Sequence, residues 1–424
     1  MNDSALRTPV QQADATGMTA IASVIVSIGL AAVGNGLMFA FIPLALGSAG
    51  YAPTWAGTIL TMMSAGGVIG CLTTGLVVQR VGHARAFMIF SALIILSNGG
   101  VAAGVNPLSW IAARTLYGFA INGMFIVAQS WLNDAVSNAI RGRVMAAFYV
   151  TYIVGLGAGS FLLGRIELAG SAAPVLGIAF AALAILPVGM TRLRQPPPPR
   201  AASVEIRRAW RISPVGLSGM LAAGGLSMMI AGFTPIHATA SGHSQQEIAT
   251  LLFAMPLGTL FVQIPAGWIS DRTDRRYVLV TAAIMVAVFG VAAGYFDGSP
   301  LAVLIVIYML WDGASESIYS LSSAHAGDRA SKEEMVALQS TLLFAWSLSG
   351  FVVPGIGTVL TALYGTIAFI YVAVAIAVVW AAFVLWRITR VVPVPAAETV
   401  SFAPMAAQAP LPVELATPED APSA

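Results

Sequence analysis

Long apolar runs, each separated from the next by a short polar segment, recur along the whole chain. A helix that spans a bilayer needs roughly 20 mostly apolar residues, and the sequence offers about a dozen such runs. Hydrophobic residues make up 58% of the chain and charged residues only 9%, whereas soluble domains carry about 25% charged residues. We therefore predict an integral membrane protein that is entirely α-helical.

The apolar runs predict twelve membrane-spanning helices. They cover residues 18–46, 54–79, 86–104, 109–135, 144–166, 173–191, 213–240, 247–270, 277–296, 300–324, 335–360 and 367–387. The first run is too long for the apolar region of a signal peptide, so we expect it to be the first span. Lysine and arginine gather in cytoplasmic loops. If the N-terminus lies in the cytoplasm, every lysine and arginine except Arg114 and Arg165 falls on the cytoplasmic side. We therefore expect both ends of the chain in the cytoplasm.

Polar segments divide the chain into two six-helix bundles. We expect an N-terminal cytoplasmic tail at 1–17, bundles at 18–191 and 213–387, a cytoplasmic linker at 192–212 and a C-terminal cytoplasmic tail at 388–424. The linker contains the run RQPPPPR and many arginines, so it is expected to be extended and outside the bilayer. The C-terminal tail is rich in alanine and proline and is expected to be disordered.

The two bundles repeat each other in sequence. When the first half of the sequence is aligned with the second half without a gap, Pro43 matches Pro235, Gly66 matches Gly258, Gly75 matches Gly267 and Arg80 matches Arg272. Glycine and proline in register matter most, because they fix helix bends and close helix packing. Two similar six-helix halves around a site near the middle of the membrane are the architecture of many secondary transporters.

Two loops at matching places in the halves carry a further motif. They read GLVVQRVGHAR, from Gly75, and GWISDRTDRR, from Gly267. Both resemble the loop signature of the major facilitator superfamily, Gly-x-x-x-Asp-Arg-x-Gly-Arg-Arg. A carboxylate in such a loop can lie at a helix N-terminus and pair with arginine, so we expect a conformational latch; the alternative is an ordinary positively charged turn. The latch residues are Gly75, Gln79, Arg80, Gly267, Asp271, Arg272, Arg275 and Arg276.

The resemblance implies the superfamily fold, two pseudo-symmetric bundles with twelve transmembrane helices. Because Gln79 stands where the family has aspartate, the first latch is expected to be weaker. The stretch RTLYGFAING matches the family's Arg-x-x-x-Gly motif with Arg114 and Gly118, and the resemblance links this arginine to proton coupling. The alternative for Arg114 is that its side chain snorkels to the nearby membrane surface.

Two more stretches resemble a bacterial group within the superfamily that includes YcaD-like proteins. They read AQSWLNDAVSNAIRGRVMA and WDGASESIYSLSSAHAGDR. In the first, Gln129 stands where the group often has an acid. In the second, Glu316 and Tyr319 match the group, whereas Asp312 stands where a glycine is common. The resemblance is specific for the superfamily and says little about the substrate.

Asp312 and Glu316 are two carboxylates one turn apart in an otherwise apolar predicted span. Counted from Pro300, they lie roughly 18 Å and 24 Å into that span. An ionised carboxylate there is costly unless it is protonated, paired or hydrated. Burial and a neighbouring like charge both favour the protonated form of a carboxyl group, so we expect Glu316 and Asp312, together with Arg114, to couple transport to protons. The alternative is a permanently hydrogen-bonded pair that fixes helix packing.

Other polar or aromatic residues in the spans are candidates for substrate contacts. They are Asn35, Asn122, Gln129, Tyr149, Tyr152, His237, Trp311 and Tyr319. Each has the alternative of an ordinary interhelical hydrogen bond or packing role. No histidine, cysteine or acidic group has metal-ligand spacing, and no phosphate-binding loop or hydrolase motif occurs, so we expect no metal, no cofactor and no enzyme activity.

The sequence therefore predicts a secondary active transporter for a small organic molecule, working by alternating access and driven by the proton gradient. Export by antiport is favoured, because two acids in a span suit a cationic or amphipathic cargo. Uptake of a small organic solute or anion by proton symport is one alternative, and a transport-inactive membrane receptor or scaffold is another. We expect a monomer in the bacterial cytoplasmic (inner) membrane, with a small-molecule substrate and lipid as partners and no nucleic acid.

Overall fold

The structure is a computed structural model that describes residues 9–136, 138–190, 204–331, 334–391 and 402. All regular structure in this part of the chain is helical, and twelve of the helices are long and apolar enough to cross a membrane. The predicted all-helical membrane fold is confirmed. The helices are α1 (Pro9–Ser48), α2 (Pro53–Val81), α3 (His83–Ala102), α4 (Pro107–Ala135), α5 (Asn138–Leu163), α6 (Ala172–Gly189), α7 (Ile206–Ile212), α8 (Pro214–Ala240), α9 (Gln245–Ser270), α10 (Arg275–Tyr295), α11 (Leu301–Gly327), α12 (Met335–Tyr364) and α13 (Ala368–Ile388).

Short-range signals fix many of the helix ends. Proline occupies the first turn of α2, α4 and α8, where its missing N–H costs nothing. Asn106 and Ser213 cap α4 and α8, and Ser244 forms a capping box with Glu247 at the start of α9. Several connecting loops turn at glycines with positive φ, such as Gly82.

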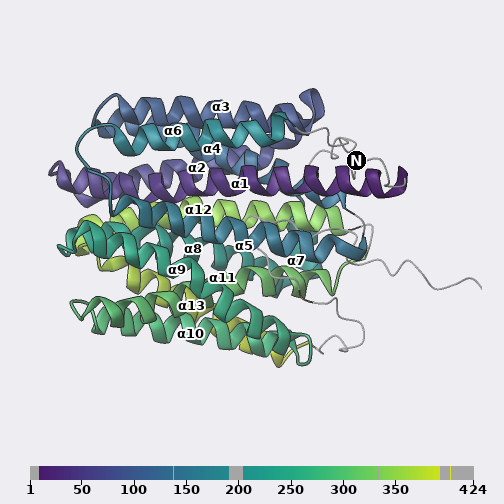
Figure 1. Ribbon diagram of the computed structural model, residues 1–424. Helices are drawn as coiled ribbons and strands as arrows, with labels where there is room; N and C mark the ends of the chain where they lie inside the picture. Colours follow the sequence, from purple (N-terminus) through teal and green to yellow (C-terminus); the bar gives the residue numbers. More distant parts are fainter. Residues whose placement is uncertain (1–8, 137, 191–203, 332–333, 392–401, 403–424) are drawn as a thin grey trace, which may run out of the picture.

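The two bundles have the same internal packing. In the first bundle α1 packs on α5 and α6, α2 on α4, and α3 on α4 and α6. The second bundle repeats every one of these pairs, with α8 on α12 and α13, α9 on α11, and α10 on α11 and α13. In Figure 1, α3 and α6 lie at one edge of the molecule and α10 and α13 at the other. The predicted pseudo-symmetric halves are therefore confirmed.

Close helix crossings explain the repeated glycine. A Cβ atom added to Gly66 would collide with the carbonyl oxygen of Thr115, and one added to Gly118 would collide with that of Met63, so α2 and α4 interlock reciprocally. Gly258 makes the equivalent approach to Met309, between α9 and α11. Small residues at such crossings allow the backbones to approach.

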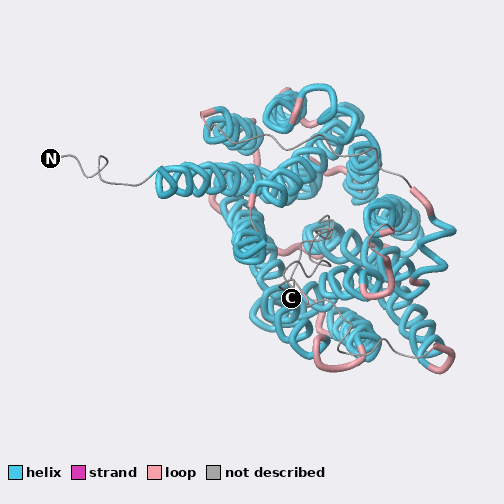
Figure 2. The backbone as a smooth tube through the Cα atoms, turned by 90° about the vertical axis from the view of Figure 1, so that its right-hand side faces the viewer, coloured by secondary structure: helices cyan, strands magenta, loops and turns pink. Residues whose placement is uncertain are grey.

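The halves meet mainly through α2 with α12 and α5 with α9. The molecule has two ends along its helices. The linker end is the one where α1 begins and where α6 finishes, and the far end is the opposite one. Figure 2 looks onto the linker end. Contacts between the halves are found at the far end. A Cβ on Gly57 would lie 3.3 Å from the Thr358 Cβ, and Gln245 Nε2 donates to the Ile166 carbonyl at 2.7 Å. The ring centroids of Phe161 and Phe253 are 5.5 Å apart.

The linker differs in part from its prediction. Residues 192–203 lie outside the described residues, but Ile206–Ile212 forms the helix α7 rather than extended chain. The Glu205 N–H donates to Thr341 Oγ1 at 2.9 Å, and Arg208 pairs with Glu334 at 3.2 Å. These contacts dock the end of the linker on the second bundle, which favours helix over extended chain.

Several helix ends also differ from the predicted ones. The helix α1 begins at Pro9 rather than residue 18, and α5 begins at Asn138 rather than residue 144. Hydropathy detects only the apolar part of a helix, so polar turns that continue it are missed. The tails at 1–8 and beyond 391 lie outside the described residues, apart from Phe402.

Candidate functional site

A cavity of about 150 Å³ lies between the two bundles and contains both predicted carboxylates. The first bundle contributes Asn35, Tyr152 and Ser160 to its polar lining. The second contributes Ser227, Thr259, Asp312, Glu316 and Trp346. The rest of the lining is apolar, with Met63, Met228 and Met255 among its members. No basic side chain lines the cavity among the residues that the structure describes.

Asp312 and Glu316 lie one turn apart on α11 and face the same space. Glu316 Oε1 accepts a hydrogen bond from Ser227 Oγ of α8 at 2.5 Å. Asp312 is 4% exposed. Two neighbouring carboxylates without an arginine or lysine make this cavity attractive to a cation or a proton.

Tyr149 and Tyr152, both on α5, approach the carboxylates from the first bundle. Tyr152 lines the cavity and hydrogen-bonds with Asn35. The Tyr149 hydroxyl is buried within electrostatic range of Asp312 and Glu316 and has no hydrogen-bond partner in the described part of the chain. The structure therefore brings residues from both halves to one pair of acids.

Arg114 does not line this cavity. It is 1% exposed within the first bundle, so it does not snorkel to the membrane surface. Its Nη2 donates to Met63 Sδ at 3.0 Å, and its guanidinium carbon lies 3.9 Å from the centre of the Tyr117 ring. The Tyr117 hydroxyl donates to Asn35 Oδ1 at 3.1 Å. Within the described part of the chain, Arg114 is thus connected to the cavity through Met63 and through the Tyr117–Asn35 contact.

The other predicted substrate contacts lie elsewhere. Asn122 donates to the Gly67 carbonyl at 2.8 Å, and Gln129 is buried inside the first bundle. His237 lies at the far end between Thr366, at 2.8 Å, and Asp297, at 3.2 Å. Trp311 packs on Tyr308 and Phe369, and Tyr319 packs on Trp346. None of these five side chains lines the central cavity.

Sequence reasoning missed several of the lining residues. Ser160, Ser227 and Thr259 are small polar residues in apolar helices, which also occur at ordinary helix contacts. Met63, Met228 and Met255 are apolar residues of the kind that fill helix cores, yet they supply much of the flexible apolar wall. Only their place on the cavity-facing side of α2, α8 and α9 distinguishes them.

A larger depression of about 510 Å³ lies at the far end, around the ends of α1 and α8. Its polar lining includes Ser48, Tyr51, Thr239, His243 and Gln245, but no aspartate, glutamate, lysine or arginine. The two carboxylates lie in the smaller central cavity instead, so we take that cavity as the candidate site.

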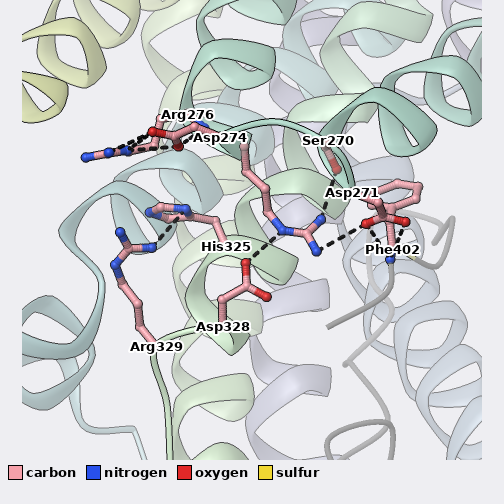
Figure 3. Close-up of polar contacts among 9 residues, drawn as sticks. Ser270, Asp271, Asp274, Arg276, His325, Asp328, Arg329 and Phe402 are labelled. Carbon is pink, nitrogen blue, oxygen red and sulfur yellow. Dashed lines mark hydrogen bonds and ion pairs between the residues drawn. The ribbon is translucent and has the colours of Figure 1, made fainter. Parts of the chain in front are cut away.

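The second predicted latch forms a network of ion pairs and hydrogen bonds at the linker end (Figure 3). Arg275 Nε donates to Asp328 Oδ2 at 2.7 Å, and both side chains are only 2% exposed. Arg275 also reaches Ser270 at 2.9 Å and Asp271 at 3.3 Å. Asp271 in turn accepts hydrogen bonds from the backbone N–H of Phe402 at 2.9 and 3.1 Å.

A neighbouring pair extends this network. Asp274 caps α10 and holds the Arg276 guanidinium through contacts of 2.7 and 3.0 Å. Burial by itself raises the pKa of Asp274, but the hydrogen bonds from Arg276 outweigh it and hold this pKa below its usual value. Arg276 also donates to the Val391 carbonyl at 2.6 Å. The loop therefore ties α9, α10 and α11 to the chain that follows α13.

The contacts named above all lie within the second bundle and the chain that follows it. Arg272 instead lies over Trp268, 4.1 Å from its ring, and Phe402 covers Gly267, where a Cβ would collide with its ring. The matching loop of the first bundle, between α2 and α3, is different. Gly75 faces open space there, and Arg80 is exposed and forms no ion pair with a described residue. That Gln79 weakens this copy stays a prediction.

Comparison with known proteins identifies the family. The model of the Major Facilitator Superfamily matches residues 24–214 and again 215–417, one match for each half. The chain belongs to this superfamily. An uncharacterized MFS-type transporter of Yersinia pestis is 26% identical over 329 residues, which cover 76% of this chain and 84% of the relative. The uncharacterized MFS-type transporter YcaD of Escherichia coli is 25% identical over 306 residues, covering 71% and 78%.

Solved structures show the same fold. A mutant of the nucleoside transporter NupG superposes with a TM-score of 0.69 at 12% identity, over 88% of this chain and 100% of that one. The human organic anion transporter MFSD10 superposes with a TM-score of 0.61 at 17% identity, over 89% of this chain and 100% of that one. The protein is therefore a multi-pass membrane transporter of the superfamily.

Proposed function

We propose that the protein exports a small organic cation or amphipathic amine in exchange for protons, with Asp312 and Glu316 as the shared binding site. The observation that carries this proposal is the central cavity itself. Two adjacent carboxylates line the cavity. Arg114, which the sequence suggested would act together with them, does not line it. A site of this charge binds a cation more readily than an anion.

The lining suits a cargo with an apolar body. Trp346 and Tyr152 offer aromatic surfaces, and three methionines can adjust to different shapes. Ser227 holds Glu316 in place, while Asp312, Asn35 and Thr259 offer further polar contacts in the lining. Protons and the cationic cargo would compete for the same carboxylates, so binding of one releases the other.

Alternating access follows from how the halves meet. The basic residues favour a cytoplasmic location for the linker end. The contacts between Gly57 and Thr358 and between Gln245 and Ile166 would then close the periplasmic side in this conformation. An antiporter in this conformation takes up its cargo from the cytoplasm and gives up its protons there.

The test is proton release from the purified protein in proteoliposomes carrying a pH-sensitive dye, as cationic, neutral and anionic compounds are added. We expect cationic compounds to elicit a proton signal in the wild type, and Glu316→Gln to abolish it. We expect Asp312→Asn to weaken the signal at least tenfold. Glu167→Gln, in an exposed turn after α5, is the matched control and should behave as the wild type.

Other outcomes would count against the proposal. If compounds cross the membrane in the Glu316→Gln and Asp312→Asn variants as they do in the wild type, the carboxylates only stabilise helix packing. If the direction of the proton signal is that of cotransport, uptake by symport replaces export. If compounds bind without transport, the transport-inactive alternative is the better one.

A further inference from the structure

Arg114 is a buried cation without a carboxylate partner in the part of the chain that the structure describes. Its side chain is 1% exposed, and Tyr117 is the only ionisable group among the described residues in electrostatic contact with it; the two side chains also share a hydrogen bond. Nη2 donates to a thioether sulfur, a weak acceptor, and Nη1 is buried without a hydrogen-bond partner. Burying a charge in this way is costly unless something compensates it.

Arg114 is one of the residues that line a small cavity. Its volume is about 20 Å³, which is enough for one water molecule or one monatomic ion. Among the described residues that line it, Arg114 has the only polar side chain; the others include Phe39, Ile59, Met63 and Ile236. A buried water needs two to four polar partners, and this lining offers one side chain. A weakly hydrated anion needs only the guanidinium and accepts apolar walls.

We propose that Arg114 binds a small monovalent anion, chloride in the cell, in this cavity. The anion would lie beside the Arg114 side chain and would neutralise its buried charge. The face of the Tyr117 ring at 3.9 Å supports the guanidinium from another side and keeps its orientation. This site is separate from the carboxylates, because neither Asp312 nor Glu316 lines it, although Met63 lines both cavities.

The walls of the anion site come from both halves. Residues of α1 and α2 form one side, and Gly232 and Ile236 of α8 form the other. The site is therefore complete only while the halves are joined at the far end. An anion that binds one conformation more tightly shifts the population toward it, so chloride stabilises the conformation described here.

Thermal unfolding of the purified protein tests this proposal. Chloride is raised from 1 to about 100 mM against gluconate at constant ionic strength. We expect chloride to cause a saturable rise in Tm of about 2–5 °C. Bromide should cause the same rise. The rise should be absent in Arg114→Gln and retained in Arg165→Gln, whose exposed arginine lies over Phe161 at the same far end. A wild type whose Tm ignores the anion, or an undiminished rise in Arg114→Gln, overturns the proposal.

A second measurement does not depend on the variant folding. Wild-type crystals grown in bromide are measured at the bromine absorption edge. We expect one anomalous peak within hydrogen-bonding distance of the Arg114 guanidinium, in the cavity bounded by Met63 and Ile236. Density for a water at that place without anomalous signal, or bromide bound only at the surface, would show that Arg114 holds no anion.

Discussion

Single glycines set how closely the helices of each bundle approach. Gly66 and Gly118 place α2 and α4 against each other's backbones, and Gly258 does the same for α9 and α11. The repeat between the halves predicts this role for Gly66 and Gly258 from the sequence alone. It cannot say which helix each glycine meets, since that depends on the packing of the whole bundle.

Gly66→Ala and Gly75→Ala are a matched pair within α2. At Gly66 the new methyl group meets the Thr115 carbonyl, whereas at Gly75 it meets open space. We expect Gly66→Ala to lower stability by about 1–3 kcal/mol through overpacking. Gly75→Ala should be neutral or stabilising by up to about 1 kcal/mol, because alanine favours helix. The measurement is the Tm of both variants in detergent. Equal Tm values would contradict the close approach of α2 and α4 at Gly66.

The residues of the central cavity show where sequence reasoning stops. Asp312 and Glu316 stand out because charge in an apolar span is costly, and Asn35 and Tyr152 are polar enough to be noticed. Ser227 gives no such signal, although it holds Glu316. His237 gives a strong signal but faces loop residues at the far end. Polarity reveals that a side chain needs a partner, and only tertiary structure reveals which partner it has.

At the scale of helices, the loop between α9 and α10 holds the linker end of the second bundle together. The motif predicts its residues, but the decisive partner, Asp328 at the end of α11, lies outside the motif. The same limitation applies to α7. The sequence of an arginine-rich segment predicts extended chain. The contacts with Thr341 and Glu334 that accompany the helix are seen only in the tertiary structure.

Breaking the Arg275–Asp328 pair tests the loop. Removing one partner of a buried ion pair leaves the other uncompensated, at a cost of about 3–5 kcal/mol. We expect Arg275→Met to lower Tm strongly, and the exchange Arg275→Asp with Asp328→Arg to recover part of the loss. Arg272→Met is the control, because Arg272 is exposed and should change stability by less than about 0.5 kcal/mol. Similar losses in Arg272→Met and Arg275→Met would contradict the assigned contact.

At the scale of the whole molecule, the two halves touch mainly through α2 with α12 and α5 with α9. Each half has its own interlocked helices, so we expect it to move as a rigid unit about these contacts. The acids lie in one half and Arg114 in the other, and the two cavities near Met63 include residues of both halves. Opening the far end would therefore change both sites at once.

A reversible cross-link at the far end tests whether the halves must separate there. In a Cys71→Ala background, Gly57→Cys with Thr358→Cys places the Cβ atoms about 3.3 Å apart, close to disulfide geometry. We expect oxidation to abolish transport and reductant to restore it. The control Gly100→Cys with Ala113→Cys has a similar spacing, 3.4 Å, within the first bundle and should leave transport unchanged. Transport that continues across the oxidised Gly57–Thr358 pair would mean that the cargo moves without this seam opening.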